Sequence, residues 1–214
     1  MSIDFSHPVI QSVLLFSLAA LIPLLLVSAT CFTRYVIVLS LLRTALGLQQ
    51  TPPNIVIISM AMFMSFFTMT PLIGDIKQSA YDPYTRGEII QEESIDIGLK
   101  TFSKFIYERV DDSDYDFIKN LTEESSQNFN IIGYDLTILI PAFMLSELKA
   151  AFQFAFIIFL PFILIDLIVA SILMALGMIM LPPISISLPV KLLIFLLVDG
   201  WTLIVGSLIK GFGI

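Results

Sequence analysis

This 214-residue chain has few charged residues, one cysteine, one histidine and one tryptophan. The single Cys31 excludes an internal disulfide, and a lone cysteine in an apolar run is typically a small buried hydrophobic residue. With His7 as the one histidine, the chain has no Cys/His cluster of the kind that holds a catalytic metal. We therefore expect no metal site.

The chain also lacks the sequence signatures of catalysis and of nucleic-acid binding. It contains no glycine-rich phosphate loop with a following lysine, and no set of nucleophile, base and acid is visible in the sequence. Its 11 basic residues are outnumbered by 18 acidic ones, whereas a nucleic-acid interface needs a basic face. We expect a protein that is not an enzyme, needs no cofactor and does not bind nucleic acid.

Charge is scarce, and most of it lies in one segment. Charged residues make up 14% of the chain, against roughly 25% in soluble domains, while 57% of the residues are hydrophobic. So much apolar surface must face lipid or other apolar proteins. Residues 75–135 hold 14 acidic and 6 basic residues, and the rest of the chain holds 4 and 5. We expect N-terminal apolar helices at 1–74, an acidic insert at 75–135 and a C-terminal helical hairpin at 136–214.

The apolar residues form four blocks without the two-residue alternation of a membrane β-barrel. We therefore predict an all-α protein of integral membrane-type helical hairpins that assemble into a ring, with a small acidic helical insert. The third block is about twice as long as one span needs, which leaves three possibilities open: one long helix, two helices broken near Pro161, or a helix partly outside the bilayer. The blocks are Pro8–Thr33, Asn54–Ile73, Ile138–Gly177 and Leu188–Ile209.

The first block is not preceded by lysine or arginine, as a secretory signal would be, so we expect a retained membrane helix kinked at Pro23. Arg34 and Arg43 follow it and are expected to act as orientation anchors that place this connection in the cytoplasm. The acidic insert would then lie on the non-cytoplasmic side. Within the insert we predict an amphipathic helix over 89–106, a short helix near 115–121 and a loop over 122–130.

The segment GMIMLPPISISLP, residues 177–189, interrupts the apolar C-terminal part. Prolines prevent regular helix, and methionines are flexible side chains that adapt to irregular gaps. Two interpretations stay open: a deformable constriction repeated around an axis by several copies, or a helix–helix turn whose side chains rest on neighbours. The candidate residues are Met178, Ile179 and Met180, with Gly177, Pro182, Pro183 and Pro189 shaping the loop.

Ionisable residues within apolar blocks usually face a partner or water. A hairpin that turns at Pro182–Pro183 would set Asp166 level with Asp199, a like-charge pair. Lys191 would be level with Asp166 only if the turn were centred on Met178–Ile179. Either the loop folds back between its helices, or Lys191 of one copy pairs with Asp166 of another. We favour the intersubunit arrangement.

Glu147 and Lys149 are two residues apart and so point to different faces of a helix. We expect them to meet different neighbours. A solvated stretch at the membrane edge is an equally good interpretation of this pair.

Three stretches carry a resemblance to a known family. They are ATCFTRYVIVLSLLRTALGLQQTPPN, SELKAAFQFAFIIFLPFILIDLIVASILMALGM and LPPISISLPVKLLIFLLVDGWTLIVGSL, which begin at Ala29, Ser146 and Leu181. They closely resemble the FliP/SctR family of type III secretion export-gate proteins, over nearly the whole chain except the acidic insert. LGLQQTPPN and VDGWTLIVGSLIKGF are more similar to the flagellar branch than to the injectisome branch.

The resemblance implies a pore-forming subunit that conducts unfolded flagellar subunits and seals the channel at rest. It implies a pentamer that joins FliQ-like and FliR-like subunits, with FlhB-like and FlhA-like export proteins nearby, in the inner membrane at the flagellar basal body. Energy would come from the proton motive force and a separate ATPase. Family members stack their helices into a tilted assembly largely above the bilayer plane, and they commonly carry a cleaved signal peptide.

The family's methionine gasket corresponds to Met178, Ile179 and Met180. The family usually has three consecutive methionines, and Ile179 is stiffer at its first side-chain torsion. Broken helices and buried charges also mark transporters of ions or small solutes, which is one alternative. An injectisome export-gate homologue is the second alternative.

Overall fold

The computed structural model describes residues 12, 16–17, 19–20, 23–24, 26–124, 135–178 and 180–212. Within these residues all regular secondary structure is helical, which confirms the predicted all-α class. Parts of the first apolar block lie outside them, including Leu21, Ile22 and Leu25 beside Pro23, so the predicted kink falls outside the described residues. Ile179 and most of the loop predicted over 122–130 also lie outside the described residues.

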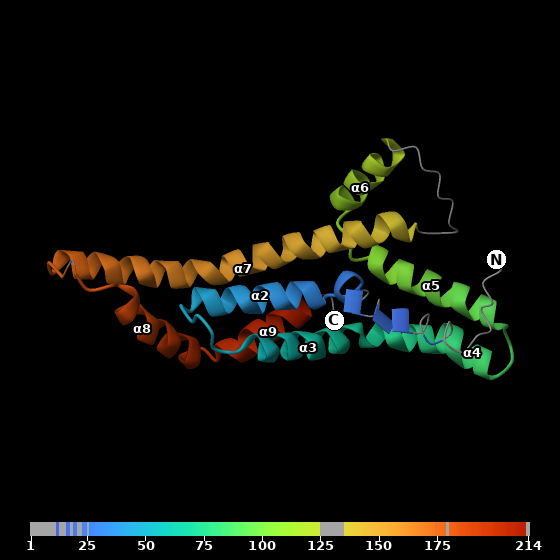
Figure 1. The fold of residues 1–214 in the computed structure, drawn as a ribbon, viewed down its shortest axis with the longest axis horizontal. Coiled ribbons are helices and arrows are strands. Elements are labelled where there is room, and N and C mark those ends of the chain that lie inside the picture. Colours follow the sequence, from blue (N-terminus) through green and yellow to red (C-terminus); the bar gives the residue numbers. More distant parts are fainter. Residues whose placement is uncertain are drawn as a thin grey trace.

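Helix α7 (Leu136–Ala175) is a single helix of 40 residues that runs along the length of the molecule (Figure 1). It begins at Asp135, whose side chain accepts a hydrogen bond from the Thr137 amide, as a helix cap does. Pro141 and Pro161 lie inside the helix without ending it. At 1.5 Å per residue it is about 60 Å long, roughly twice the apolar thickness of a bilayer. The possibility of two helices broken near Pro161 is therefore wrong: the third block is one long helix.

Helix α2 (Phe32–Ala45) lies against both α7 and α3 (Asn54–Ile76), and these three helices form the centre of the core. The face of α2 that meets its neighbours is fully buried at Tyr35, Val38 and Leu42. Helix α3 continues through the π-helical turn η1 (Lys77–Tyr81) and α4 (Asp82–Thr85). The predicted insert boundary at residue 75 thus falls inside a continuous helical stretch.

The acidic insert contains α5 (Gln91–Tyr107) and α6 (Asp112–Glu124), which confirms both helices predicted there. Helix α5 returns along the end of α3, whereas α6 packs on the start of α7 and projects away from the main body (Figure 1). The first three residues of the loop predicted over 122–130 belong to α6.

The C-terminal block consists of α8 (Ile184–Leu197) and α9 (Gly200–Lys210), which are bent by 64° relative to each other. Asp199 forms the bend with φ 49°, a left-handed conformation that is uncommon for a residue with a side chain. Gly200 follows it, and a Cβ there would lie 2.2 Å from the Phe195 ring. The fourth apolar block is therefore broken at its centre.

The irregular segment before α8 is shorter than the predicted 177–189, because α8 already begins at Ile184 and contains Pro189 in its first two turns. Pro189 is the sixth residue of α8, where it removes one backbone donor without ending the helix. Pro189 therefore does not shape the loop.

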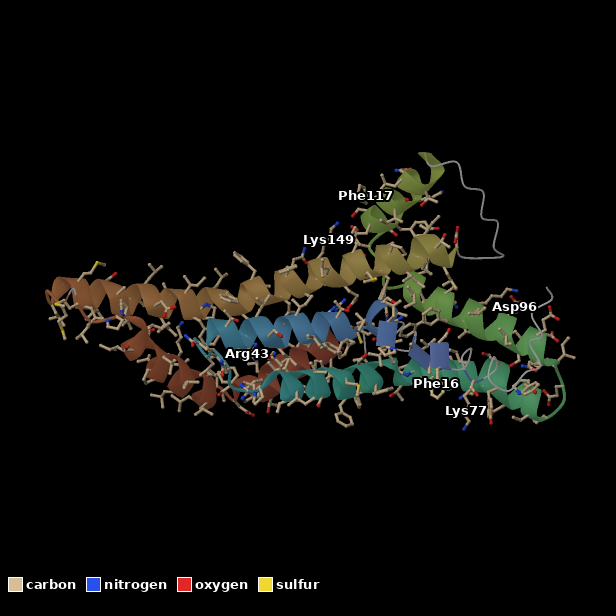
Figure 2. All side chains as sticks on the ribbon, viewed as in Figure 1. Phe16, Arg43, Lys77, Asp96, Phe117 and Lys149 are labelled. Carbon is tan, nitrogen blue, oxygen red and sulfur yellow. The ribbon has the colours of Figure 1, made fainter. Side chains whose placement is uncertain are left out.

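Two helical stretches, Asn54–Thr85 and Leu136–Ala175, are long and apolar enough to cross a membrane. The bent pair α8–α9 makes a third if it counts as one span. The apolar side chains on these helices are extensively exposed in the single chain (Figure 2). Such a surface needs lipid or other apolar proteins around it.

Candidate functional site

The turn between α7 and α8 lies at one end of the molecule, far from the insert (Figure 1). Gly177 has φ +73°, and two hydrogen bonds, from the Gly177 amide to Met174 and from the Met178 amide to Leu173, close the end of α7. This is the Schellman arrangement, which requires a left-handed residue and so favours glycine. Pro183 then caps the start of α8, and its carbonyl accepts from the Ser187 amide.

The methionines of this turn point away from the rest of the chain. Met180 is 98% exposed and Met178 is 41% exposed, with Leu176 and Leu181 also exposed beside them. The backbone is thus a helix–helix turn; the side chain of Met180 is almost free of neighbours within the chain, whereas Met178 is partly covered. The result is an apolar tip, formed by Leu176, Met178, Met180 and Leu181, at the end of a long hairpin.

Behind the tip, Lys191 joins three elements. Its ammonium lies 2.6 Å from Asp166 Oδ2 on α7 and donates a 3.1 Å hydrogen bond to the Ala45 carbonyl at the end of α2. The intersubunit pairing favoured from the sequence is therefore wrong for this pair, which forms within one chain. The physical reason is that Gly177 reverses the chain before Pro182–Pro183, so Lys191 and not Asp199 lies level with Asp166.

Glu147 and Lys149 contact different neighbours, as predicted. Glu147 is 1% exposed and pairs with Arg34 of α2 through two hydrogen bonds, of 2.9 and 2.5 Å. A solvated position at the membrane edge is wrong for Glu147. Lys149 points to another face and pairs with Asp114 of α6, which also accepts from Ser146 at 2.9 Å.

The two arginines predicted as orientation anchors both hold parts of the chain together. Besides Glu147, Arg34 contacts the carbonyl of Gly211 at 3.4 Å. Arg43 donates to the Pro52 carbonyl at 3.1 Å and to Asn54 Oδ1 at 2.7 Å, and so closes the loop between α2 and α3.

Sequence analysis missed a cluster at the C-terminal end of α9. The Phe212 ring is buried between the guanidinium groups of Arg34 and Arg109, which lie 5.3 and 5.2 Å from its centroid. Arg109 also stacks on Phe105, and burial lowers the pKa of its guanidinium from the ordinary value. Arg34, Arg109 and Phe212 are far apart in the sequence, and no local pattern connects them.

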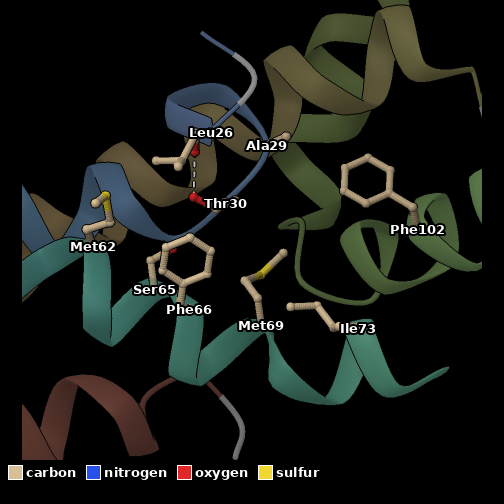
Figure 3. A pocket seen from close by; sticks show the side chains of 9 residues that line it. All are labelled: Leu26, Ala29, Thr30, Met62, Ser65, Phe66, Met69, Ile73 and Phe102. Carbon is tan, nitrogen blue, oxygen red and sulfur yellow. Dashed lines mark hydrogen bonds between the residues drawn. The ribbon is translucent and has the colours of Figure 1, made fainter. Parts of the chain in front are cut away.

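A cavity of about 330 Å³ lies between the segment before α2, α3 and α5 (Figure 3). Its walls are almost entirely apolar, and the hydroxyl of Thr30 in its wall is already bonded to the Leu26 carbonyl. Such a cavity offers no polar groups to a cofactor. Among the described residues no group of three or more His, Cys, Asp or Glu could hold a metal ion.

Comparison with known proteins gives consistent matches along the chain. A protein-family model described as the FliP family matches residues 15–208. The chain is 42% identical to the flagellar biosynthetic protein FliP of Pectobacterium carotovorum, with 95% of this chain and 78% of that protein covered. It is also 42% identical to the protein of the same description from Bacillus subtilis, over 95% of this chain and 91% of the other. It is 43% identical to the flagellar biosynthetic protein FliP of Borreliella burgdorferi, with 95% of this chain and 81% of that protein covered.

Proposed function

Since this chain belongs to the FliP family and is a component of the flagellar export apparatus, we propose that it is the pore-forming subunit of the type III export gate. In this role several copies surround a channel that conducts unfolded flagellar subunits and is sealed at rest. The observation that carries the proposal is the exposed apolar tip on the α7–α8 hairpin. The FliP family is one of structural export proteins rather than enzymes.

The tip has the properties that a seal needs. Methionine side chains are unbranched and polarizable, so several copies can close a gap of irregular shape and separate again when a chain passes. Met178 and Met180 are exposed, and Ile179 lies between them in the sequence. When such side chains meet around an axis, they exclude water from the channel, and ions then face a high barrier.

The hairpin behind the tip is held firmly, which a seal also needs. Lys191 fixes α8 to both α7 and the end of α2, at 2.6 and 3.1 Å. A site supported by locked side chains on regular helices keeps its geometry better than a site on a loop. The tip can thus return to the same closed position after each passage.

The exposed apolar side chains along α7, such as Phe152, Phe156 and Leu160, support an assembly of several chains. We propose five copies together with FliQ-like and FliR-like subunits, FlhB-like and FlhA-like export proteins nearby, and lipid at the outer surface. The assembly would lie in the bacterial inner membrane at the flagellar basal body. Because basic residues favour the cytoplasmic side, the acidic insert would lie on the non-cytoplasmic side.

The decisive experiment replaces Met178, Ile179 and Met180 together with alanine in cells that make the complete gate. We expect the complex to assemble and the inner membrane to leak a small solute. Met144→Ala, an exposed methionine near the other end of α7, is the control and should not leak. Normal assembly with an unchanged permeability would contradict the seal.

Purification separates the gate from its alternatives. A gate subunit should purify with FliQ-like and FliR-like proteins, whereas a transporter of ions or small solutes should move its solute when reconstituted alone. An injectisome homologue would be encoded beside injectisome genes and would restore secretion rather than motility.

A further inference from the structure

Most charges outside the acidic insert are paired within the chain. Arg34 pairs with Glu147, Lys191 with Asp166, and Lys149 with Asp114. Among the described residues, Asp199 has no cation within ion-pair distance. Arg43, likewise, has carbonyl and amide oxygens as its partners but no carboxylate. Lys210, at the end of α9, also has no carboxylate within ion-pair distance among the described residues, but Asp199 and Arg43 carry opposite charges and lie near the same bend.

Asp199 stands at the α8–α9 bend in a strongly apolar setting. Its neighbours Leu196, Leu197 and Val198 are 70%, 76% and 54% exposed. We call residues 196–199 the elbow knob. A carboxylate on an apolar surface that faces lipid or protein is costly unless a donor reaches it, so Asp199 requires a partner from outside the described chain.

A complementary hollow lies close to Arg43. A cavity of about 270 Å³ is lined by Leu39, Pro52, Val56, Ile57, Met60 and Trp201, with no polar wall. Arg43 borders this socket, because one nitrogen of its guanidinium donates to the Pro52 carbonyl. A guanidinium has five N–H donors, and the remaining ones of Arg43 have no described partner. The socket thus offers an apolar floor with a cation beside it.

We propose that the elbow knob of one copy docks into the socket of the adjacent copy and that its Asp199 pairs there with Arg43. This rests on the proposed function, in which several copies surround a channel. A head-to-tail contact of this kind uses two different patches on each chain and closes into a ring when repeated by rotation. An apolar anchor together with a desolvated charge pair fixes the register of such a contact.

The position of the two groups suits this geometry. Trp201, two residues after Asp199, lines the same socket as Pro52, which Arg43 contacts. The knob and the socket therefore lie at the same level of the molecule, where the bend meets the start of α3 (Figure 1). Rotation about an axis parallel to the long helices does not change the height of a group along that axis. Two groups that pair between adjacent copies must therefore lie at the same height.

Disulfide trapping tests the contact directly in the assembled gate. A chain with both Asp199→Cys and Arg43→Cys should form a ladder of linked multimers on a non-reducing gel after mild oxidation. Cys31 can stay, because it is fully buried. The control pair, Lys210→Cys with Arg43→Cys, should form no ladder, since Lys210 lies at the far end of α9. A link within single chains, or no link in an assembled complex, would overturn the proposal.

Charge reversal gives a second measurement. Asp199→Arg and Arg43→Asp should each weaken the multimer about tenfold on native gels, and the double variant should recover most of the loss. Asp199→Asn removes the negative charge but keeps the size of the side chain. This single change leaves Arg43, and therefore the loop that Arg43 closes, unaltered. A double variant no better than the singles would count against the pairing. If the ladder forms but the alanine triple variant does not leak, the proposed seal fails and this contact stands.

Discussion

Lys191 connects Asp166 and the carbonyl of Ala45, 2.6 and 3.1 Å away, although Ala45 lies on a helix 146 positions earlier in the sequence. Its side chain is almost completely buried, whereas that of Asp166 is 44% exposed. Because the ammonium is the donor in both contacts, it fixes the α7–α8 hairpin to the end of α2. The position of the exposed tip depends on this junction.

Exchanging the two charges should restore only part of what either single change loses. Asp166→Lys and Lys191→Asp should each lower stability by about 1–3 kcal/mol, because a polar group loses its partner. The double variant reforms the ion pair, but a carboxylate at position 191 cannot donate to the Ala45 carbonyl. Thermal unfolding of the purified protein in detergent measures this. Full recovery would show that the contact with Ala45 contributes nothing.

Removing Arg34 should be among the most damaging single changes in the core. Arg34→Ala leaves the carboxylate of Glu147, which is 1% exposed, without its cation, and losing one partner of a buried pair costs about 3–5 kcal/mol. Arg34→Lys should recover little, because an ammonium cannot make the two-pronged contact. The midpoint of thermal unfolding is the measure. Arg86→Ala, which breaks the exposed pair with Glu88, is the matched control and should change stability by less than about 0.5 kcal/mol.

Two glycines near the C-terminus should respond oppositely to alanine. Gly200→Ala places a Cβ 2.2 Å from the Phe195 ring, which itself packs edge-on against Trp201, so either the ring or the α8–α9 bend must move. We expect a loss of about 1–3 kcal/mol. Gly206→Ala lies inside α9 with open space around it and should stabilise by up to about 1 kcal/mol. Limited proteolysis and thermal unfolding distinguish the two, and equal effects would refute the close approach at Gly200.

The start of α6 should depend on acid pH. Asp111 Oδ1 accepts hydrogen bonds from the hydroxyl and the amide of Ser113, and these bonds hold the pKa of the Asp111 carboxyl below its ordinary value. Because the folded-state pKa is depressed, the ionised carboxylate stabilises α6 above the ordinary carboxyl pKa of about 3.9, and this contribution is lost as the pH falls through the folded-state value. Hydrogen exchange at the first turn of α6 should therefore quicken in that range. Asp111→Asn keeps an acceptor but cannot ionise, so its exchange should lack this pH-dependent step.

Local patterns were sufficient for several features of the fold. The continuous apolar run of the third block, with Ala, Leu, Ile and Phe throughout, predicted helix, and α7 follows it nearly end to end. The spacing of isoleucines and phenylalanines in the insert predicted α5. The two-residue offset of Glu147 and Lys149 correctly predicted different partners. Each of these conclusions depends on residues within a few helical turns of one another.

The partners themselves could not be read from such patterns. The intersubunit interpretation of Asp166 and Lys191 failed because prolines were taken to mark the turn, whereas Gly177 reverses the chain earlier. The pairing of Glu147 with Arg34, 113 positions apart, has no local signal. The bend at Asp199 interrupts a run that is apolar on both sides, so hydropathy alone does not reveal it.

The sequence by itself determined the helical class, the acidic composition of the insert and the family to which the chain belongs, because hydrophobic periodicity, composition and long motifs are properties of neighbouring residues. The tertiary structure alone decided which charges meet, where the last apolar block bends and which surfaces stay exposed. Those features depend on where helices end and how they pack, and a shift of one turn exchanges one partner of Asp166 for another.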